Sequence, residues 1–421
     1  MTLFSKSLAL LLSSFGALML LSCSHTEAVP ASAPIPPQTQ IPTETLIPTQ
    51  TMEFEPGMKA LAEHLAAQLE QSSVGNQLNK VVVDPQTKQP QLKKIVIDPF
   101  FDTVSGYPVK INPRINAILS GAIAKRFAVV GTMAPKNLEI SEYVLTGMVT
   151  LGDAEKGKGR DYKVYAAVFE KASGIVHAAS EVHIGNFDTT PMDIYKDSPV
   201  YLKGKNHDAH VSSVKKKRND TINKGYRDKL SSRSLTVQGD ELYEEKDYNQ
   251  SFTFYNRASG TPAGRDMEVL NGLFTNLVRQ GRLEEAGPVY GNLLRVSIDE
   301  TREVASKITF GPNSTVPLAA KAGVYHIYMK QIAQLVGSVP GCRVKIIGHS
   351  SRTGSEPYND KLSLQRALSI QTQMASYSRQ VLGRSEALGR GIRDNIVGTG
   401  ADDLSDEIDR RVEFQFSACG H

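Results

Sequence analysis

The chain has 421 residues and a formal net charge of +4 at neutral pH. Hydrophobic residues make up 40% and charged residues 22%, which is typical of soluble globular domains, and this length suggests roughly two to four of them. The small net charge argues against a nucleic-acid-binding protein, which normally carries a concentrated basic face. Three scattered cysteines are too few for a zinc site of the CxxC type.

Residues 1–22 have the pattern of an export signal. Lys6 precedes an apolar run over residues 8–21, which is shorter than the roughly 20 apolar residues that a helix needs to cross a bilayer. The run ends in Leu-Leu-Ser-Cys at 20–23, which resembles the lipobox of bacterial lipoproteins. This resemblance implies that Cys23 is diacylated and becomes the first residue of the mature chain. The alternative is a plain secretory signal in which the cysteine is incidental.

Residues 23–56 are rich in Pro, Thr, Ser and Gln and show no apolar periodicity. This composition predicts a disordered, partly polyproline tether, which at about 3.1 Å per residue would reach on the order of 100 Å. Ser24 follows the cysteine, whereas an aspartate there would resemble an inner-membrane retention signal. We therefore expect the lipid anchor to lie in the outer membrane.

Residues 57–200 alternate between helical and strand patterns and predict an α/β domain that ends in an antiparallel meander. His177 and His183 lie on one predicted strand without a carboxylate pair, so we expect satisfied or exposed histidines and no metal site. The pattern resembles the small α/β domain of curli-secretion, flagellar-type and penicillin-binding-protein-activator lipoproteins. The predicted helices are 57–71 and 112–127, and the predicted strands are 94–98 (stopped by Pro99), 127–130, 143–151, 162–170 and 175–184.

Residues 201–231 are polar and basic and include Lys-Lys-Lys-Arg at 215–218. The segment is either a patch for an anionic surface or a solvated linker between domains. We expect the linker, because no aromatic residues alternate with the basic ones.

Residues 232–297 contain an apolar pattern that recurs after 35 residues. It predicts two helix–turn–helix units with turns at 246–247 and 280–282, and it resembles tetratricopeptide repeats. The resemblance implies a groove for a protein partner, and a structural spacer is the alternative. Two repeats are fewer than the three usually needed for stability, so we expect them to pack on a neighbouring domain. The matched pairs are Gly239/Phe274, Leu242/Leu277, Tyr248/Leu283, Ser251/Ala286, Tyr255/Tyr290 and Ala258/Leu293.

Residues 300–421 predict a βαβαβ domain with strands at 307–310, 342–347 and 412–416 and helices at 318–336 and 362–377. Leu364, Ala367, Leu368 and Met374 are the expected inward face of the second helix. About 115 residues here resemble an OmpA-like peptidoglycan-binding domain. The residues that carry the resemblance are, in order, Ile308-Thr309-Phe310, Asn313-Ser314, the run Val344 to Ser350, Gly354, Tyr358-Asn359, Leu362-Ser363, Arg366-Ala367, Gly398-Thr399-Gly400 and Arg410 to Glu413.

This resemblance implies a ligand, the diaminopimelate side chain of the peptidoglycan stem peptide, which carries an ammonium and a carboxylate. Arg366 occupies the position of the family's carboxylate-binding arginine, one turn into the helix, and offers a bidentate partner. Asn359 is expected to fix the loop by hydrogen bonds to backbone groups. The N–H groups at the helix N-terminus, near Leu362–Ser363, are expected to favour an anion. The remaining expected site residues are Phe310, Gly311, His349 and Ser351.

The sequence departs from the family pattern at Ser351, which replaces the aspartate that usually meets the ligand ammonium. Gly311 also stands where many members carry Asp or Asn, and Asp360 is a candidate substitute for the missing acid. Three outcomes follow from the sequence: ordinary binding through Arg366 and backbone groups, weakened binding, or a changed ligand such as an amidated stem peptide.

The segment Gly-His-Ser-Ser at 348–351 lacks the Gly-x-Ser-x-Gly elbow of serine hydrolases, and the sequence places no acid to orient His349. We expect His349 to brace the loop, and we expect no catalytic residues, cofactor or metal. Cys342 starts the central predicted strand and Cys419 follows the last one. If these strands are antiparallel neighbours, the two cysteines lie at the same end of the sheet and form a disulfide.

These features predict an outer-membrane lipoprotein that faces the periplasm, binds peptidoglycan through residues 300–421, and meets a protein partner through its helical repeats. The alternatives are a subunit of a secretion, pilus or flagellar apparatus and an activator of a wall synthase. The predicted fold class is multidomain, with an α/β domain, a short helical-repeat pair and an α+β domain of OmpA type.

Overall fold

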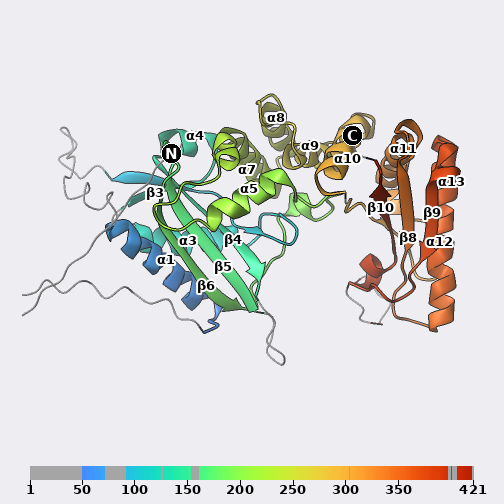
Figure 1. The fold of residues 1–421 in the computed structure, drawn as a ribbon, viewed down its shortest axis with the longest axis horizontal. Coiled ribbons are helices and arrows are strands. Elements are labelled where there is room, and N and C mark those ends of the chain that lie inside the picture. Colours follow the sequence, from blue (N-terminus) through green and yellow to red (C-terminus); the bar gives the residue numbers. More distant parts are fainter. Residues whose placement is uncertain are drawn as a thin grey trace, which may run out of the picture. The chain divides into compact units, whose positions relative to one another are not determined.

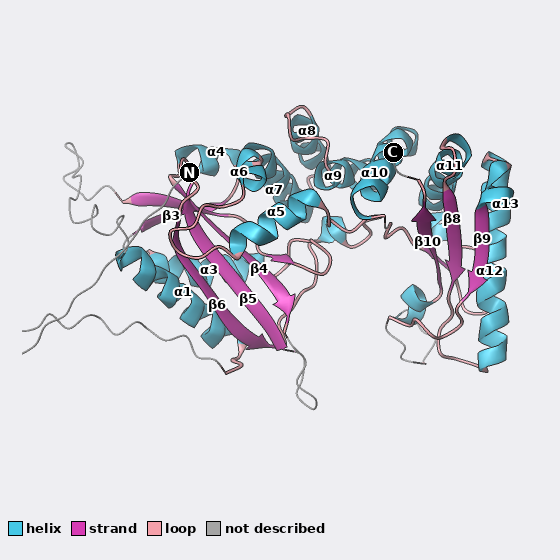
Figure 2. Ribbon diagram, viewed as in Figure 1, coloured by secondary structure: helices cyan, strands magenta, loops and turns pink. Residues whose placement is uncertain are grey.

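The computed structural model describes residues 50–71, 92–124, 127–152, 161–302, 304–396, 400 and 405–419. The export signal, Cys23, nearly all of the tether, and Gly398 and Thr399 lie outside the described residues. The described parts are mixed α/β (Figure 2). Within them, no helix has the length and apolar character required to cross a membrane. No group of three or more potential metal ligands occurs among them either.

The first sheet has the order β3-β1-β4-β5-β6, with β2 also paired to β4 (Figure 1). The pairs β1–β3 and β1–β4 are parallel, and β4, β5 and β6 form the predicted antiparallel meander. The strands are β1 (Lys93–Ile97), β2 (Phe101–Asp102), β3 (Phe127–Thr132), β4 (Tyr143–Leu151), β5 (Asp161–Glu170) and β6 (Val176–Gly185).

Helices cover both faces of this sheet, because alternate side chains of each strand point to opposite faces. Helices α1 (Phe54–Gln71) and α3 (Asn112–Ile123) pack in one core with Ile95 and Ile97. The intervening Val96 belongs to a second core, to which α4 (Pro135–Ile140) contributes Leu138.

The basic linker predicted for residues 201–231 is wrong. This segment forms α5 (Lys205–Val214) and α6 (Lys224–Asp228), and Ala209, Ile222 and Tyr226 are buried against the second face of the sheet. The segment has few apolar residues, which lie among lysines, so its composition indicated a linker. These apolar residues are buried only because they pack on a sheet whose strands are distant in the sequence.

The repeat segment forms two helical pairs, α7 (Leu230–Glu244) with α8 (Tyr248–Ser259) and α9 (Met267–Arg279) with α10 (Leu283–Thr301). Both turns lie where the 35-residue pattern predicts them. Gly272 permits the close approach of α8 and α9, because a Cβ there would lie 1.9 Å from the Tyr255 ring.

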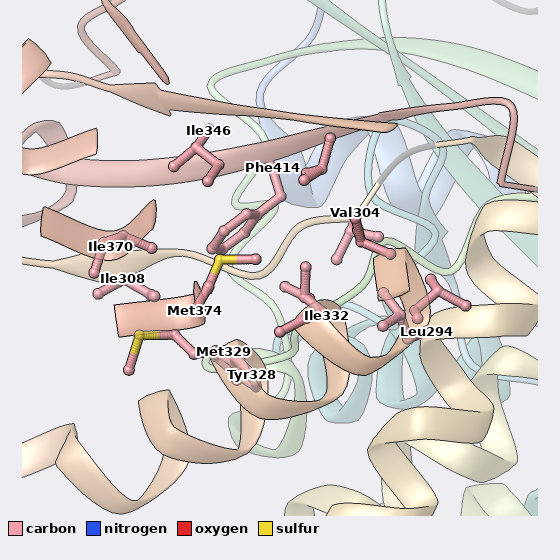
Figure 3. Packing of buried hydrophobic residues seen from close by; sticks show 14 of the residues in the cluster. Leu294, Val304, Ile308, Tyr328, Met329, Ile332, Ile346, Ile370, Met374 and Phe414 are labelled. Atoms are coloured by element: carbon pink, nitrogen blue, oxygen red, sulfur yellow. The ribbon is translucent and has the colours of Figure 1, made fainter. Parts of the chain in front are cut away.

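Helices α9 and α10 share a core with the C-terminal domain. Phe274 and Tyr290 contact Tyr328 of α11 (Ala322–Ser338), with ring centroids 6.0 and 4.8 Å apart. Figure 3 shows Leu294 and Val304 beside Ile332 in this core. The helical pairs therefore pack on a neighbouring domain, as expected for so short a repeat.

The second sheet has the order β7-β10-β8-β9, and helices cover one of its faces. Strand β10 is antiparallel to β7 and β8, whereas β9 is parallel to β8. Ile346 and Phe414 point toward Ile370 and Met374 on the covered face (Figure 3). The elements are β7 (Ile308–Thr309), α11 (Ala322–Ser338), β8 (Arg343–Gly348), α12 (Glu356–Tyr377), α13 (Gln380–Arg384), β9 (Ser385–Gly389) and β10 (Arg411–Ser417), with 3-10 turns η2 (Ala319–Lys321) and η3 (Ser405–Asp409). A further 3-10 turn, η1 (Asp193–Tyr195), lies against α7 and α9.

Three expectations for this domain are corrected. Strand β9 is an additional element of the βαβαβ order, and its sequence, Ser-Glu-Ala-Leu-Gly, has no β-branched residue to indicate a strand. Helix α12 begins at Glu356, before the predicted start at residue 362, with Pro357 in its first turn. Leu364 and Leu368 are exposed, while Ala367 and Met374 face the core.

A disulfide joins Cys342 and Cys419, whose Cα atoms are 4.2 Å apart. It closes the end of the sheet at which Arg343 of β8 pairs with Ser417 of β10. The bond links residues separated by 77 positions, so it restricts the unfolded chain substantially.

We predict that the purified, unreduced chain exposes at most one reactive thiol on unfolding, that of Cys23. Replacing both Cys342 and Cys419 with serine should lower the free energy of unfolding by about 2–4 kcal/mol, because the loop is no longer closed in the unfolded state. Urea denaturation measures this change. A count of three thiols, or a reductant that destabilises the double variant as much as the parent, would contradict the pairing.

Candidate functional site

Arg366 lies in the interior of α12 and joins two loops at one end of the second sheet. Its Nε donates to the Ser314 carbonyl at 2.8 Å, and its Nη1 donates to the His349 carbonyl at 2.9 Å. Its Nη2 donates to the Gly311 carbonyl at 3.1 Å. The side chain is fully buried, and its guanidinium carbon lies 5.3 Å from the centre of the Phe310 ring.

These contacts change the role expected for Arg366. The sequence placed it one turn into the helix with its fork facing a ligand carboxylate, but the helix begins ten residues earlier and these donors are directed to loop carbonyls. A buried cation is costly unless hydrogen bonds satisfy it. Arg366 therefore fixes the positions of residues 311–314 and 349, which we call, together with residues 350–355, the loop cradle.

Close packing between α12 and the strands holds the floor of the loop cradle. A Cβ at Gly348 would lie 1.9 Å from the Ser363 carbonyl oxygen, so only glycine allows this contact. Leu362 and Ser363 are buried in this packing. They lie well inside the helix, so the anion-attracting N-terminal N–H groups expected near them are not there.

Asn359 holds the loop that follows β8. It is buried, and its Nδ2 donates to the Thr353 carbonyl at 3.0 Å. In the same loop, the Ser350 N–H donates to the Gly391 carbonyl at 2.9 Å, and the Ser350 carbonyl accepts from Asn395 Nδ2 at 3.1 Å. These bonds agree with the backbone-bracing role expected for Asn359.

The His349 side chain lies on the opposite face of the sheet from α12. Its Nε2 is 3.6 Å from Glu413 Oε2 and its Nδ1 is 3.9 Å from Asp394 Oδ2. Glu413 follows Val412 and precedes Phe414, whose ring points toward the helices, so alternation places Glu413 and His349 on the other face. The expectation that no acid lies near His349 is therefore wrong, since both acids come from distant parts of the chain.

His349 nevertheless lacks the arrangement of a catalytic base. Neither ring nitrogen makes a hydrogen bond with a described residue, and the Ser350 hydroxyl is directed to the Asn359 carbonyl at 3.5 Å. A nucleophile–base pair requires a hydrogen bond within reach of the reacting hydroxyl. Among the described residues the histidine thus packs and braces the loop.

Ser351, which replaces the family's acid, and Asp360, its candidate substitute, both lie among the described residues. Ser351 is buried within the loop cradle. Asp360 is partly buried and forms a bidentate pair with Arg393 at 2.7 Å for each bond, which lowers the pKa of Asp360. Asp360 is therefore already engaged by a cation and does not replace the acid that is missing at Ser351.

Sequence reasoning missed a buried polar cluster on the second face of the first sheet. Asp98 is fully buried and accepts hydrogen bonds from Tyr226 Oη at 2.6 Å and Arg233 Nε at 3.0 Å. His210 Nε2 lies 3.3 Å from the same carboxylate. Burial raises the pKa of Asp98, and the Arg233 charge partly offsets this effect. The only signal in the sequence is an acid directly after a buried strand.

No protein-family model matches the chain, and no curated protein is significantly similar to it. Solved structures resemble about a quarter of it. The peptidoglycan-associated lipoprotein from Burkholderia pseudomallei is 21% identical, with a TM-score of 0.23, and the match covers 26% of this chain and 89% of that one. The C-terminal domain of Helicobacter pylori MotB is 19% identical, with a TM-score of 0.23, and the match covers 27% of this chain and 84% of that one. The cell wall anchor of the T6SS from Pseudomonas aeruginosa is 26% identical, with a TM-score of 0.20, and the match covers 25% of this chain and 71% of that one. At these TM-scores the similarities assign no function to this chain.

The Glu413 carboxylate gives the site a testable pH dependence. Burial raises the pKa of Glu413, but the contact with His349 and the charge of Arg411 outweigh it and bring the pKa from 4.5 to about 2. A folded-state pKa below the unfolded value stabilises the fold above the unfolded pKa, and this stability is lost as the pH falls.

We predict that the free energy of unfolding decreases between pH 4.5 and pH 2, and that Glu413→Gln removes about 1–2 kcal/mol of this decrease, since its side chain is partly screened by solvent. Denaturation at several pH values measures the effect. Glu386→Gln, at an exposed position on β9, is the control. Identical acid profiles for parent and Glu413→Gln would contradict the assignment.

Proposed function

We propose that the chain binds peptidoglycan non-covalently at the loop cradle and is attached to the outer membrane through a lipid on Cys23. The observation that carries this function is the buried Arg366, which joins both loops through their carbonyls at the positions where the OmpA-like motif residues occur. A site held by a locked side chain on a helix is preorganised, which lowers the cost of binding.

The expected ligand is the diaminopimelate stem peptide, whose side chain carries a carboxylate and an ammonium. Arg352 is exposed, follows Ser351 directly, and supplies a cation for the carboxylate at the rim. Tyr358 and Val316 are also exposed, and the Tyr358 hydroxyl donates to Asn313 Oδ1 at 3.3 Å. The hydroxyl of Ser351 replaces an acid, so the ammonium gains less than it would from a carboxylate.

In this proposal the helical pairs have a structural role, and they also bind a protein partner. Their α9–α10 surface already packs against α11, so a partner would have to use other surfaces of the repeats. The same proposal includes that the helical pairs belong to the tetratricopeptide class and that the chain is attached to the outer membrane. Its alternatives are that the chain is a subunit of an envelope assembly or an activator of a wall synthase.

We predict that the chain from residue 24 onward sediments with purified sacculi. This form is preferred to residues 300–421 alone, because that fragment would lose the core shared with α9 and α10. Arg352→Ala should weaken binding severalfold without loss of stability, since the residue is exposed. Ser351→Asp should strengthen binding by restoring an acid for the ammonium.

Arg366→Lys tests the cradle itself, because it keeps the charge but loses the planar fork. It should weaken binding more than tenfold, and circular dichroism must show that it remains folded. Lys361→Ala, exposed on the same helix, is the matched control. Failure of the parent to sediment would overturn the function. Parent-level binding by both arginine variants would overturn the site.

We also predict that Cys23→Ala abolishes incorporation of a labelled fatty acid and releases the chain from the outer-membrane fraction, because acyl chains provide the membrane affinity. Gel detection of the label and fractionation of the envelope measure both effects. Ser24→Ala should behave as the parent. Unchanged labelling of Cys23→Ala would rule out this lipid attachment.

A further inference from the structure

A cavity that shares no lining residue with the loop cradle is large enough for a ligand. Its volume is about 460 Å³, within the roughly 300–1,000 Å³ of typical ligand sites. Its walls come from residues 191–201, from α9, and from residues 305–328, all within one compact unit of the chain. We call this cavity the aromatic pocket.

The interior of the aromatic pocket is formed by buried rings. Tyr107 stacks on Tyr195 with centroids 5.3 Å apart, and Phe274 lies 6.0 Å from Tyr328. Tyr325 extends this wall, with its centroid 6.4 Å from that of Tyr328. Such a lining favours an apolar group over a charged one.

One polar atom in this wall is not satisfied by the protein. Thr275 is 9% exposed, and its Oγ1 is buried without a hydrogen-bond partner among the described residues. An unsatisfied buried hydroxyl costs about 1–3 kcal/mol. An N–H or carbonyl group of a bound molecule would relieve this cost.

The lining contains four basic side chains, Lys196, Arg279, Lys307 and Lys321, and a single acidic one, Asp197. Lys321 lies 3.6 Å from Asp197 and 3.4 Å from Glu407, and Lys196 lies 2.7 Å from Asp193. Lys307 and Arg279 form no ion pair with a described acid, and Arg279 donates instead to the Tyr248 hydroxyl at 3.2 Å. The lining thus carries an excess of positive charge that the surrounding described residues only partly balance.

We infer that the aromatic pocket binds an acidic peptide segment of a partner protein and receives one large apolar side chain of that segment. The apolar side chain enters between the rings, and the flanking carboxylates meet the lysines and the arginine. A peptide fits better than a free small acid, because the cations come from three separate segments and one carboxylate cannot reach them all. The Thr275 hydroxyl then bonds a main-chain group of the peptide.

The probe is the capped peptide acetyl-Glu-Glu-Phe-Glu-Glu-amide, titrated calorimetrically into the chain from residue 24 onward. We expect saturable binding that weakens as the salt concentration rises. The peptide with glutamines in place of the glutamates, and the peptide with alanine in place of phenylalanine, should each bind at least tenfold more weakly. Equal affinity for the glutamine peptide, or no binding of the acidic one, would overturn the inference.

Variants of the chain locate the peptide. Lys307→Gln should weaken binding severalfold, and Thr275→Val, which keeps the shape but removes the hydroxyl, should also weaken it. Lys330→Gln, exposed on α11 outside the cavity, is the control and should bind as the parent. Parent-level affinity in both Lys307→Gln and Thr275→Val would overturn the inference. Phenylacetate that competes with the peptide at equal affinity would contradict a peptide site.

This inference is independent of wall binding. Addition of the acidic peptide at saturation should leave sedimentation with sacculi unchanged, because the aromatic pocket and the loop cradle share no lining residue. Loss of sedimentation in the presence of the peptide would show that both ligands use one site and would overturn the assignment to the aromatic pocket.

Discussion

The buried guanidinium of Arg366 is the constraint on which the candidate site depends. An arginine in a helix interior cannot remain without hydrogen-bond partners in the protein core. Its bonds to the carbonyls of Ser314, His349 and Gly311 satisfy it and at the same time define where both loops lie. The Phe310 ring covers its face, and Gly348 lets α12 approach the sheet closely enough for these bonds to form.

The two ends of the second sheet are fixed in different ways. At one end, where Arg343 pairs with Ser417, the Cys342–Cys419 disulfide ties β8 to the chain after β10. At the other end, where Gly348 pairs with Val412, Arg366 connects the loops through main-chain hydrogen bonds. The disulfide stabilises one end of the sheet against unfolding, and the hydrogen bonds of Arg366 hold the loops of the loop cradle at the other end. The shared core with α9 and α10 extends this support to the helical pairs.

The sequence predicted local structure well where the pattern was itself local. The meander of β4, β5 and β6 followed from the alternating strand patterns, and the helical pairs followed from the recurrence that places Tyr255 and Tyr290 at equivalent positions. Composition misled at residues 201–231, because the apolar partners of Tyr226 lie on a distant sheet. His349 could not be assigned its acids, since Asp394 and Glu413 approach it only after folding. Arg366 was predicted to face a ligand carboxylate, but it donates to loop carbonyls whose positions no sequence spacing encodes.

The most direct test of the central claim is a nuclear magnetic resonance titration of the chain from residue 24 onward with a soluble tetrapeptide that contains diaminopimelate. If the loop cradle is the binding site, backbone amide signals of Gly311, Ser314, His349 and Ser351 will shift together and saturate, while those of the aromatic pocket stay in place. Absent shifts, or shifts confined to residues remote from Arg366, would contradict the account.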